Sequence, residues 1–100
     1  MKSEFKNPAL AAALKLKARQ IADLETAISE FDHNASILDR QIAAEEKRTG
    51  ITDPTDPAYS SFAKSAVQRR DNLRASAASL KAALEATLRE RDTVLERVEQ

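Results

Sequence analysis

Apolar residues recur at alternating intervals of four and three between residues 10 and 42, which constrains this part of the chain to one long helix with a single apolar stripe. The two interleaved columns of the stripe are Leu14, Ile21, Ile28, Ala35 and Ile42, and Leu10, Lys17, Leu24, Phe31 and Leu38. Only Lys17 interrupts about five heptads. The spacing therefore predicts one strand of a coiled coil.

The helical pattern stops once, in the segment RTGITDPTDPAYSSF at residues 48–62, which holds the only glycine and two of the three prolines. Gly50 fits the left-handed residue that ends a helix, and Asp56 before Pro57 fits a cap and first position of the next one. At the start of the chain, Asn7 and Pro8 form the same kind of signal. We therefore expect helices at about 8–48 and 57–98, with a turn at about 49–56.

The second predicted helix also carries an apolar stripe, although a less regular one. Its two columns are Tyr59, Ala66, Leu73 and Leu80, and Ala63, Ala77 and Leu84, and the stripe continues through Leu88, Leu95 and Val98. The consecutive steps of four at Leu80, Leu84 and Leu88 predict a stutter that locally unwinds the supercoil. Val67, Leu88 and Leu95 either broaden the core stripe or mark a second contact surface.

Two helices of nearly equal length around one short turn predict an all-α protein, in which two long helices form an antiparallel coiled-coil hairpin. We expect this hairpin to be the single domain of residues 1–100. Charged residues make up 32% of the chain and aromatic residues only 4%, a composition typical of long helices rather than of a mixed core.

The charge balance and the absence of cysteine bound the environment of the protein. Sixteen basic and 16 acidic residues give zero net charge, which argues against a dedicated nucleic-acid-binding protein. No apolar run approaches the roughly 20 residues that span a bilayer, and the chain contains no cysteine. Lys15 and Lys17 interrupt the early alanine and leucine stretch, so we expect a helix start rather than a signal peptide, and a cytoplasmic protein.

The sequence offers no pattern for catalysis. A single glycine excludes a glycine-rich phosphate loop, and His33, the only histidine, lacks companions at metal-ligand spacing. Glu45 and Glu46 are adjacent, so on a helix their side chains point about 100° apart and cannot act together on one substrate atom. We predict no catalytic residue, cofactor, metal or small-molecule substrate, and no enzyme activity.

The most polar stretch of the second helix is QRRDNLR at residues 68–74. Either phase of the stripe brings Arg69 or Arg70 close to the helix interface. One of these arginines is expected to lay its stem on the interface and to pair with Asp39 or Asp32 across the hairpin. The alternative is that the stretch forms a polar recognition patch for another protein.

The segments LDRQIAAEEKRTGITDP (residues 38–54) and AYSSFAKSAVQRRDNLRASA (residues 58–77) closely resemble a bacterial branch of the flagellar export protein FliJ family. The resemblance covers roughly residues 15–85 and is strongest around the turn. It implies a two-helix antiparallel coiled coil in the central pore of a hexameric export ATPase. It also implies contact with the membrane-embedded export gate protein and a role in cycling export chaperones.

If the resemblance holds, the part of the hairpin that carries both chain termini should meet the ATPase ring, by analogy with rotary stalks. The expected contacts are its exposed charges, Lys15, Lys17, Arg19, Arg89, Glu90 and Arg91. A patch near the turn, formed by Tyr59, Arg69 and Arg70, is the alternative contact.

Two other functions stay open from the residues alone. One is a generic coiled-coil adaptor or a chaperone docking protein. The other is a nucleic-acid-associated regulator that uses the basic residues, but zero net charge and the lack of a helix-turn-helix pattern argue against it.

Overall fold

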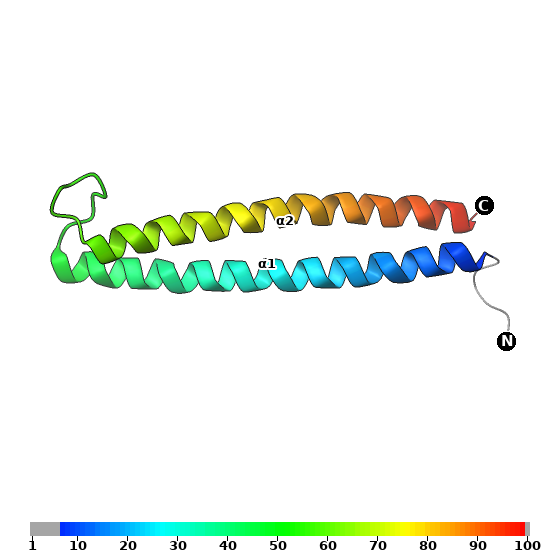
Figure 1. The fold of residues 1–100 in the computed structure, drawn as a ribbon, viewed down its shortest axis with the longest axis horizontal. Coiled ribbons are helices and arrows are strands. Elements are labelled where there is room, and N and C mark those ends of the chain that lie inside the picture. Colours follow the sequence, from blue (N-terminus) through cyan, green and yellow to red (C-terminus); the bar gives the residue numbers. More distant parts are fainter. Residues whose placement is uncertain (1–6, 100) are drawn as a thin grey trace. The chain divides into compact units, whose positions relative to one another are not determined.

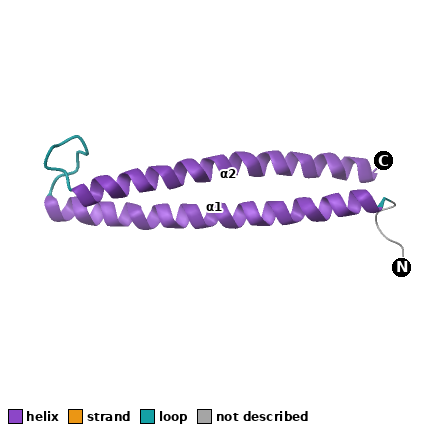
Figure 2. Ribbon diagram, in the orientation of Figure 1, coloured by secondary structure: helices purple, strands orange, loops and turns teal. Residues whose placement is uncertain are grey.

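The computed structural model describes residues 7–99, which form two long helices and no strand (Figures 1 and 2). Helix α1 spans Pro8–Thr49 and helix α2 spans Ser61–Glu99, and the two run antiparallel. The predicted fold class, an all-α helical hairpin, is confirmed. The chain divides into two compact units, which are the tip unit of residues 28–78 and the terminal unit of residues 7–27 and 79–99.

Both ends of α1 follow the signals in the sequence. The Asn7 side-chain oxygen accepts a hydrogen bond from the amide of Ala9 at 2.9 Å, so Asn7 caps the helix as predicted. At the other end, Gly50 has a φ of 75°, and its amide donates to the carbonyl of Glu46 at 2.8 Å. A left-handed residue with this bond is a common helix stop, and glycine adopts it without steric cost.

The predicted start of the second helix at Pro57, with Asp56 as its cap, is wrong. Asp53 and Asp56 each begin a four-residue turn, because their carbonyls accept hydrogen bonds from the amides three residues later, at 3.0 and 2.9 Å. Aspartate followed by proline is favoured in such turns as well as at helix starts. Helix α2 begins at Ser61, and its cap is Ser60, whose hydroxyl accepts from the amide of Ala63 at 3.2 Å.

Large side chains of α1 pack against small ones of α2 in the core of the tip unit. Leu38, Ile42 and Ala66 form a buried cluster, and Val67 and Leu73 pack against it. The other buried apolar residues of the unit are Ile28 and Ala35 on α1, Ala63 and Ala77 on α2, and Tyr59 in the loop. Alanines at buried α2 positions let the two helix backbones approach closely. Val67 thus belongs to the core stripe rather than to a second surface.

The terminal unit has a thinner core. Its described apolar stripe residues are half-buried rather than fully buried; they are Leu10, Leu14, Ile21 and Leu24 on α1, and Leu80, Leu84, Leu88, Val94 and Val98 on α2. Two helices alone cover only one side of each stripe, which explains the residual exposure. Neither helix of residues 7–99 holds a stretch long and apolar enough to cross a bilayer.

The stutter predicted at Leu80, Leu84 and Leu88 stays a prediction, since all three residues are half-buried. The buried and half-buried positions of α2 and the preceding loop include an unbroken series with alternating steps of four and three: residues 59, 63, 66, 70, 73, 77, 80, 84, 87, 91, 94 and 98. Arg70, Thr87 and Arg91 occupy three of these positions. A search for apolar residues alone passes over them and reaches Leu95, which is exposed.

Candidate functional site

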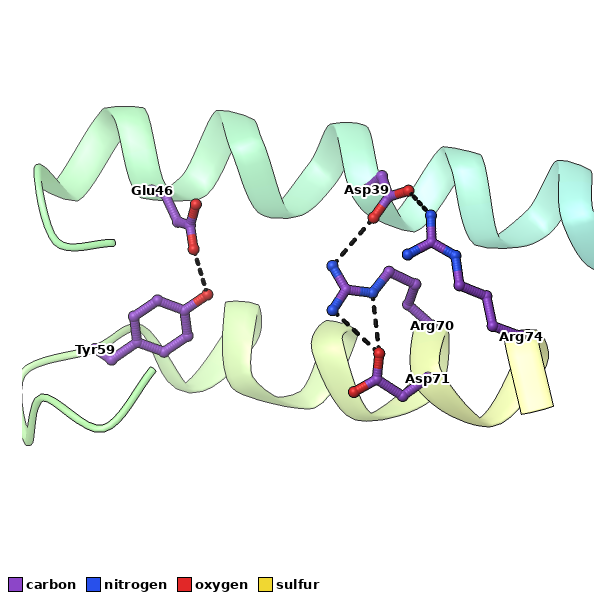
Figure 3. Close-up of polar contacts among 6 residues, drawn as sticks. All are labelled: Asp39, Glu46, Tyr59, Arg70, Asp71 and Arg74. Carbon is purple, nitrogen blue, oxygen red and sulfur yellow. Dashed lines mark hydrogen bonds and ion pairs between the residues drawn. The ribbon is translucent and has the colours of Figure 1, made fainter. Parts of the chain in front are cut away.

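One side of the tip unit is closed by charged side chains that meet across the two helices (Figure 3). Asp39 on α1 accepts a hydrogen bond from Arg70 Nη1 at 3.1 Å and a second one from Arg74. Arg70 also pairs with its neighbour Asp71 at 3.0 Å. Burial of Arg70 acts to lower its pKa, but the hydrogen bonds to Asp71 and Asp39 outweigh it and raise the pKa. The guanidinium therefore stays charged between the helices.

This cluster settles the choice between the two arginines. Arg70 is the one that lies in the helix interface and pairs with Asp39, as one of the alternatives predicted. Both side chains are partly exposed, so the pair contributes about 1 kcal/mol or less to stability. Its main effect is to fix how the helices align, since Asp39 pairs with Arg70 and Arg74 on two adjacent turns of α2.

Tyr59 fastens the loop to α1 on the same unit (Figure 3). Its ring is buried, and its hydroxyl donates a hydrogen bond to Glu46 Oε2 at 2.7 Å. The bond to the Glu46 carboxylate, together with burial, raises the pKa of the phenol above its usual value. Tyr59 therefore holds the loop in place, and its ring is not available as a surface contact.

The tip unit also carries an open groove between the helices. The groove has a volume of about 620 Å³ and is lined by Asn34, Ile37, Leu38, Gln41, Arg69, Asn72, Leu73 and Ser76. Leu38 and Leu73, two members of the core cluster, line it together with half-buried Ile37. None of its lining residues takes part in the Asp39 cluster, so groove and cluster use different residues of α1 and α2.

A second, shallower hollow continues the groove, because Gln41 lines both. Its volume is about 320 Å³, and its other lining residues are Ala44, Glu45, Arg48 and Phe62. Phe62 is 55% exposed, a large aromatic surface left in water. Arg48 and Glu45 pair with each other, so this hollow carries no net charge.

The cations predicted to contact an ATPase lie in the terminal unit but differ in their availability. Lys15, Arg19 and Arg89 are exposed, and none of them pairs with another residue of the described range 7–99. Lys17 is half-buried in the helix interface and pairs with Glu90 at 2.5 Å. Arg91 pairs with Asp92 at 2.9 Å. Lys17 and Glu90 thus form an ion pair between the two helices.

The alternative contact near the turn is not one patch. Tyr59 is buried, Arg70 is engaged with Asp39 and Asp71, and only Arg69 is exposed, on the wall of the groove. Sequence reasoning missed the groove and Phe62. The available signal was an aromatic residue outside both stripe columns of the second helix.

The described residues offer no arrangement for metal chemistry. Within 7–99, no three histidine, cysteine, aspartate or glutamate side chains gather closely enough to hold an ion, and His33 is exposed. The site is therefore a set of surfaces: the groove with Phe62, and the free cations of the terminal unit. No protein-family model, curated protein or solved structure matches the chain.

Proposed function

We propose that this chain is a non-enzymatic stalk or adaptor of the FliJ type, which works in the cytoplasm in flagellar type III protein export. Its partners in this proposal are the hexameric export ATPase and the export gate protein, with export chaperones as further partners. The observation that carries the proposal is the hairpin itself. The residues that resemble the FliJ family lie at the turn and just beyond it, where the structure makes its loop and its first contacts between the helices.

The resembling residues have identifiable structural tasks. Gly50 ends α1, Asp53 and Pro54 make the first turn of the loop, Tyr59 fastens the loop to Glu46, and Arg70 joins the helices through Asp39. Since these tasks build a hairpin, the shared residues support a shared fold. The partners need their own test.

We place the ATPase contact on the exposed cations of the terminal unit, Lys15, Arg19 and Arg89. A stalk that works inside a ring needs contacts that form and break readily, and exposed charges give weak, salt-sensitive attraction. Lys17 is left out of the contact because it is already bound to Glu90.

The test is binding to the purified export ATPase of the same organism, with stimulation of ATP hydrolysis as a second readout. The variant carries Lys15→Glu and Arg19→Glu, both exposed, and its control carries Arg40→Glu and Lys64→Glu, two exposed and unpaired cations of the tip unit. The two proteins have the same net charge, so only the position of the reversed charges differs.

We expect the terminal reversal to weaken binding, most strongly at low salt, and the control to bind as the unmodified chain does. Equal binding by all three proteins would move the contact away from the terminal unit. If the unmodified chain does not bind the export ATPase at all, the flagellar assignment is wrong and a general coiled-coil adaptor is the better description.

A further inference from the structure

The groove of the tip unit contains polar groups that the hairpin itself does not use. Asn34, Gln41, Asn72 and Arg69 line it, and none of them makes a side-chain hydrogen bond or ion pair with another residue of the range 7–99. On the other flank of the same helices, Asp39 and Glu46 both have partners. The polar side chains on one flank of the helix pair therefore have partners within the described part of the hairpin, whereas those that line the groove on the other flank do not.

The dimensions of the groove fit a third helix. Its lining on α1 runs from Asn34 to Arg48 when the shallow hollow is included, which at about 1.5 Å per residue corresponds to roughly 21 Å. Apolar Ile37, Leu38 and Leu73 line it, with Phe62 beside its shallow part. A groove between two helices that offers apolar side chains can seat an amphipathic helix, which is read through residues at i, i+3, i+4 and i+7.

The charges of the groove lining indicate which charged group the bound helix should carry. Glu45 and Arg48 neutralise each other, so Arg69 is the one charged lining residue without a partner among the described residues. A carboxylate on the incoming helix would form an ion pair with Arg69. A second copy of this chain would not, because a two-fold interface through the groove pairs the lining with itself, and the lining has no free acid to offer.

We propose that the groove binds an amphipathic helix of a partner protein, which lays an apolar stripe over Ile37, Leu73 and Phe62 and places a carboxylate on Arg69. This docking site goes beyond the stalk function proposed above, because it lies within the tip unit and does not involve the cations of the terminal unit. Phe62 and Arg69 belong to residue types that are enriched in protein–protein interfaces relative to the rest of the protein surface.

The probe is a synthetic peptide of about 16 residues, with leucines at i, i+3, i+4 and i+7 and one glutamate beside the stripe. A second peptide carries lysine in place of the glutamate. Both are titrated into the full chain and followed by fluorescence anisotropy, and the side-chain amide resonances of Asn34, Gln41 and Asn72 report where they bind. No export ATPase is present, so the result is independent of the stalk proposal.

We expect the unmodified chain to prefer the glutamate peptide by about threefold or more. Arg69→Glu reverses this preference, while Arg40→Glu, an exposed arginine outside the groove, leaves it unchanged. Phe62→Ala weakens both peptides. Circular dichroism confirms that each variant keeps its helix content.

Three outcomes would overturn the proposal. One is no saturable binding of either peptide, and another is a preference that Arg69→Glu does not alter. The third is a dimer of the unmodified chain in sedimentation that Phe62→Ala dissociates, which would make a second copy the occupant of the groove.

Discussion

Leu38 lies between the core of the tip unit and its groove, and shortening it tests how strongly the core stabilises the unit. The side chain is 6% exposed and packs in the cluster with Ile42 and Ala66. It also lines the groove. Leu38→Ala removes apolar contacts from the best-packed part of the molecule without adding a polar group or changing charge.

The size of the effect follows from that position. Truncation of a buried leucine to alanine costs about 2–5 kcal/mol, and the upper part of this range reflects a closed cavity left behind. At Leu38 the vacated space opens into the groove, where water can enter, so the cavity contribution is small. We therefore expect the free energy of unfolding to fall by about 2–3 kcal/mol. The matched change Leu16→Ala, at a residue 55% exposed, should cost less than about 0.5 kcal/mol.

Urea unfolding measures both variants with two probes. Far-ultraviolet circular dichroism follows all of the helix, and tyrosine fluorescence follows the tip unit alone, because Tyr59 is the only tyrosine and the chain has no tryptophan. Leu38→Ala should lower the fluorescence midpoint clearly below that of Leu16→Ala. Equal midpoints for the two variants would show that the cluster of Leu38, Ile42 and Ala66 does not stabilise the tip unit.

Two further predictions concern the loop. Ser60→Ala should lower the free energy of unfolding by about 1 kcal/mol and shift the start of α2 in backbone NMR chemical shifts, whereas Asp56→Ala should leave that start at Ser61 because its carboxylate serves a turn. The Tyr59 pKa is raised, so the stabilisation from its bond to Glu46 is complete below the usual phenol pKa and is lost as pH rises through the folded value. Phenolate absorbance should therefore show ionisation at a lower pH in Glu46→Ala than in the unmodified chain, and identical titrations would contradict the bond.

Much of the fold could be predicted because the deciding signals are local. Asn7 with Pro8 starts α1, Gly50 ends it, and the spacing of its apolar residues gives the correct buried stripe. The start of α2 could not be predicted in the same way. An aspartate before a proline suits both a helix cap and a four-residue turn. The dipeptide alone therefore does not tell whether a helix or a turn follows it. In the loop, Tyr59 has its contact with Glu46, and the helix starts after it.

The stripe of α2 shows a second limit of sequence patterns. Lysine and arginine can bury their stems while their charged ends reach a partner, so an interface position need not be apolar. Lys17 and Arg70 do this against Glu90 and Asp39. The pattern of apolar residues is blind to such positions, because their stability depends on a partner supplied by the other helix. This is why the apolar residues of α2 alone form a less regular stripe than its buried and half-buried positions do.

Arg69 and Arg70 show how closely stability and recognition can lie in this protein. On a helix, neighbouring side chains point about 100° apart, so one step along α2 moves from the bridge to Asp39 to the wall of the open groove. Arg70 forms ion pairs within the chain, with Asp39 and Asp71. The side chain of Arg69 has no ion-pair partner among the described residues. A variant that removes both arginines together would therefore mix a loss of helix pairing with a loss of binding, and only single substitutions can separate the two.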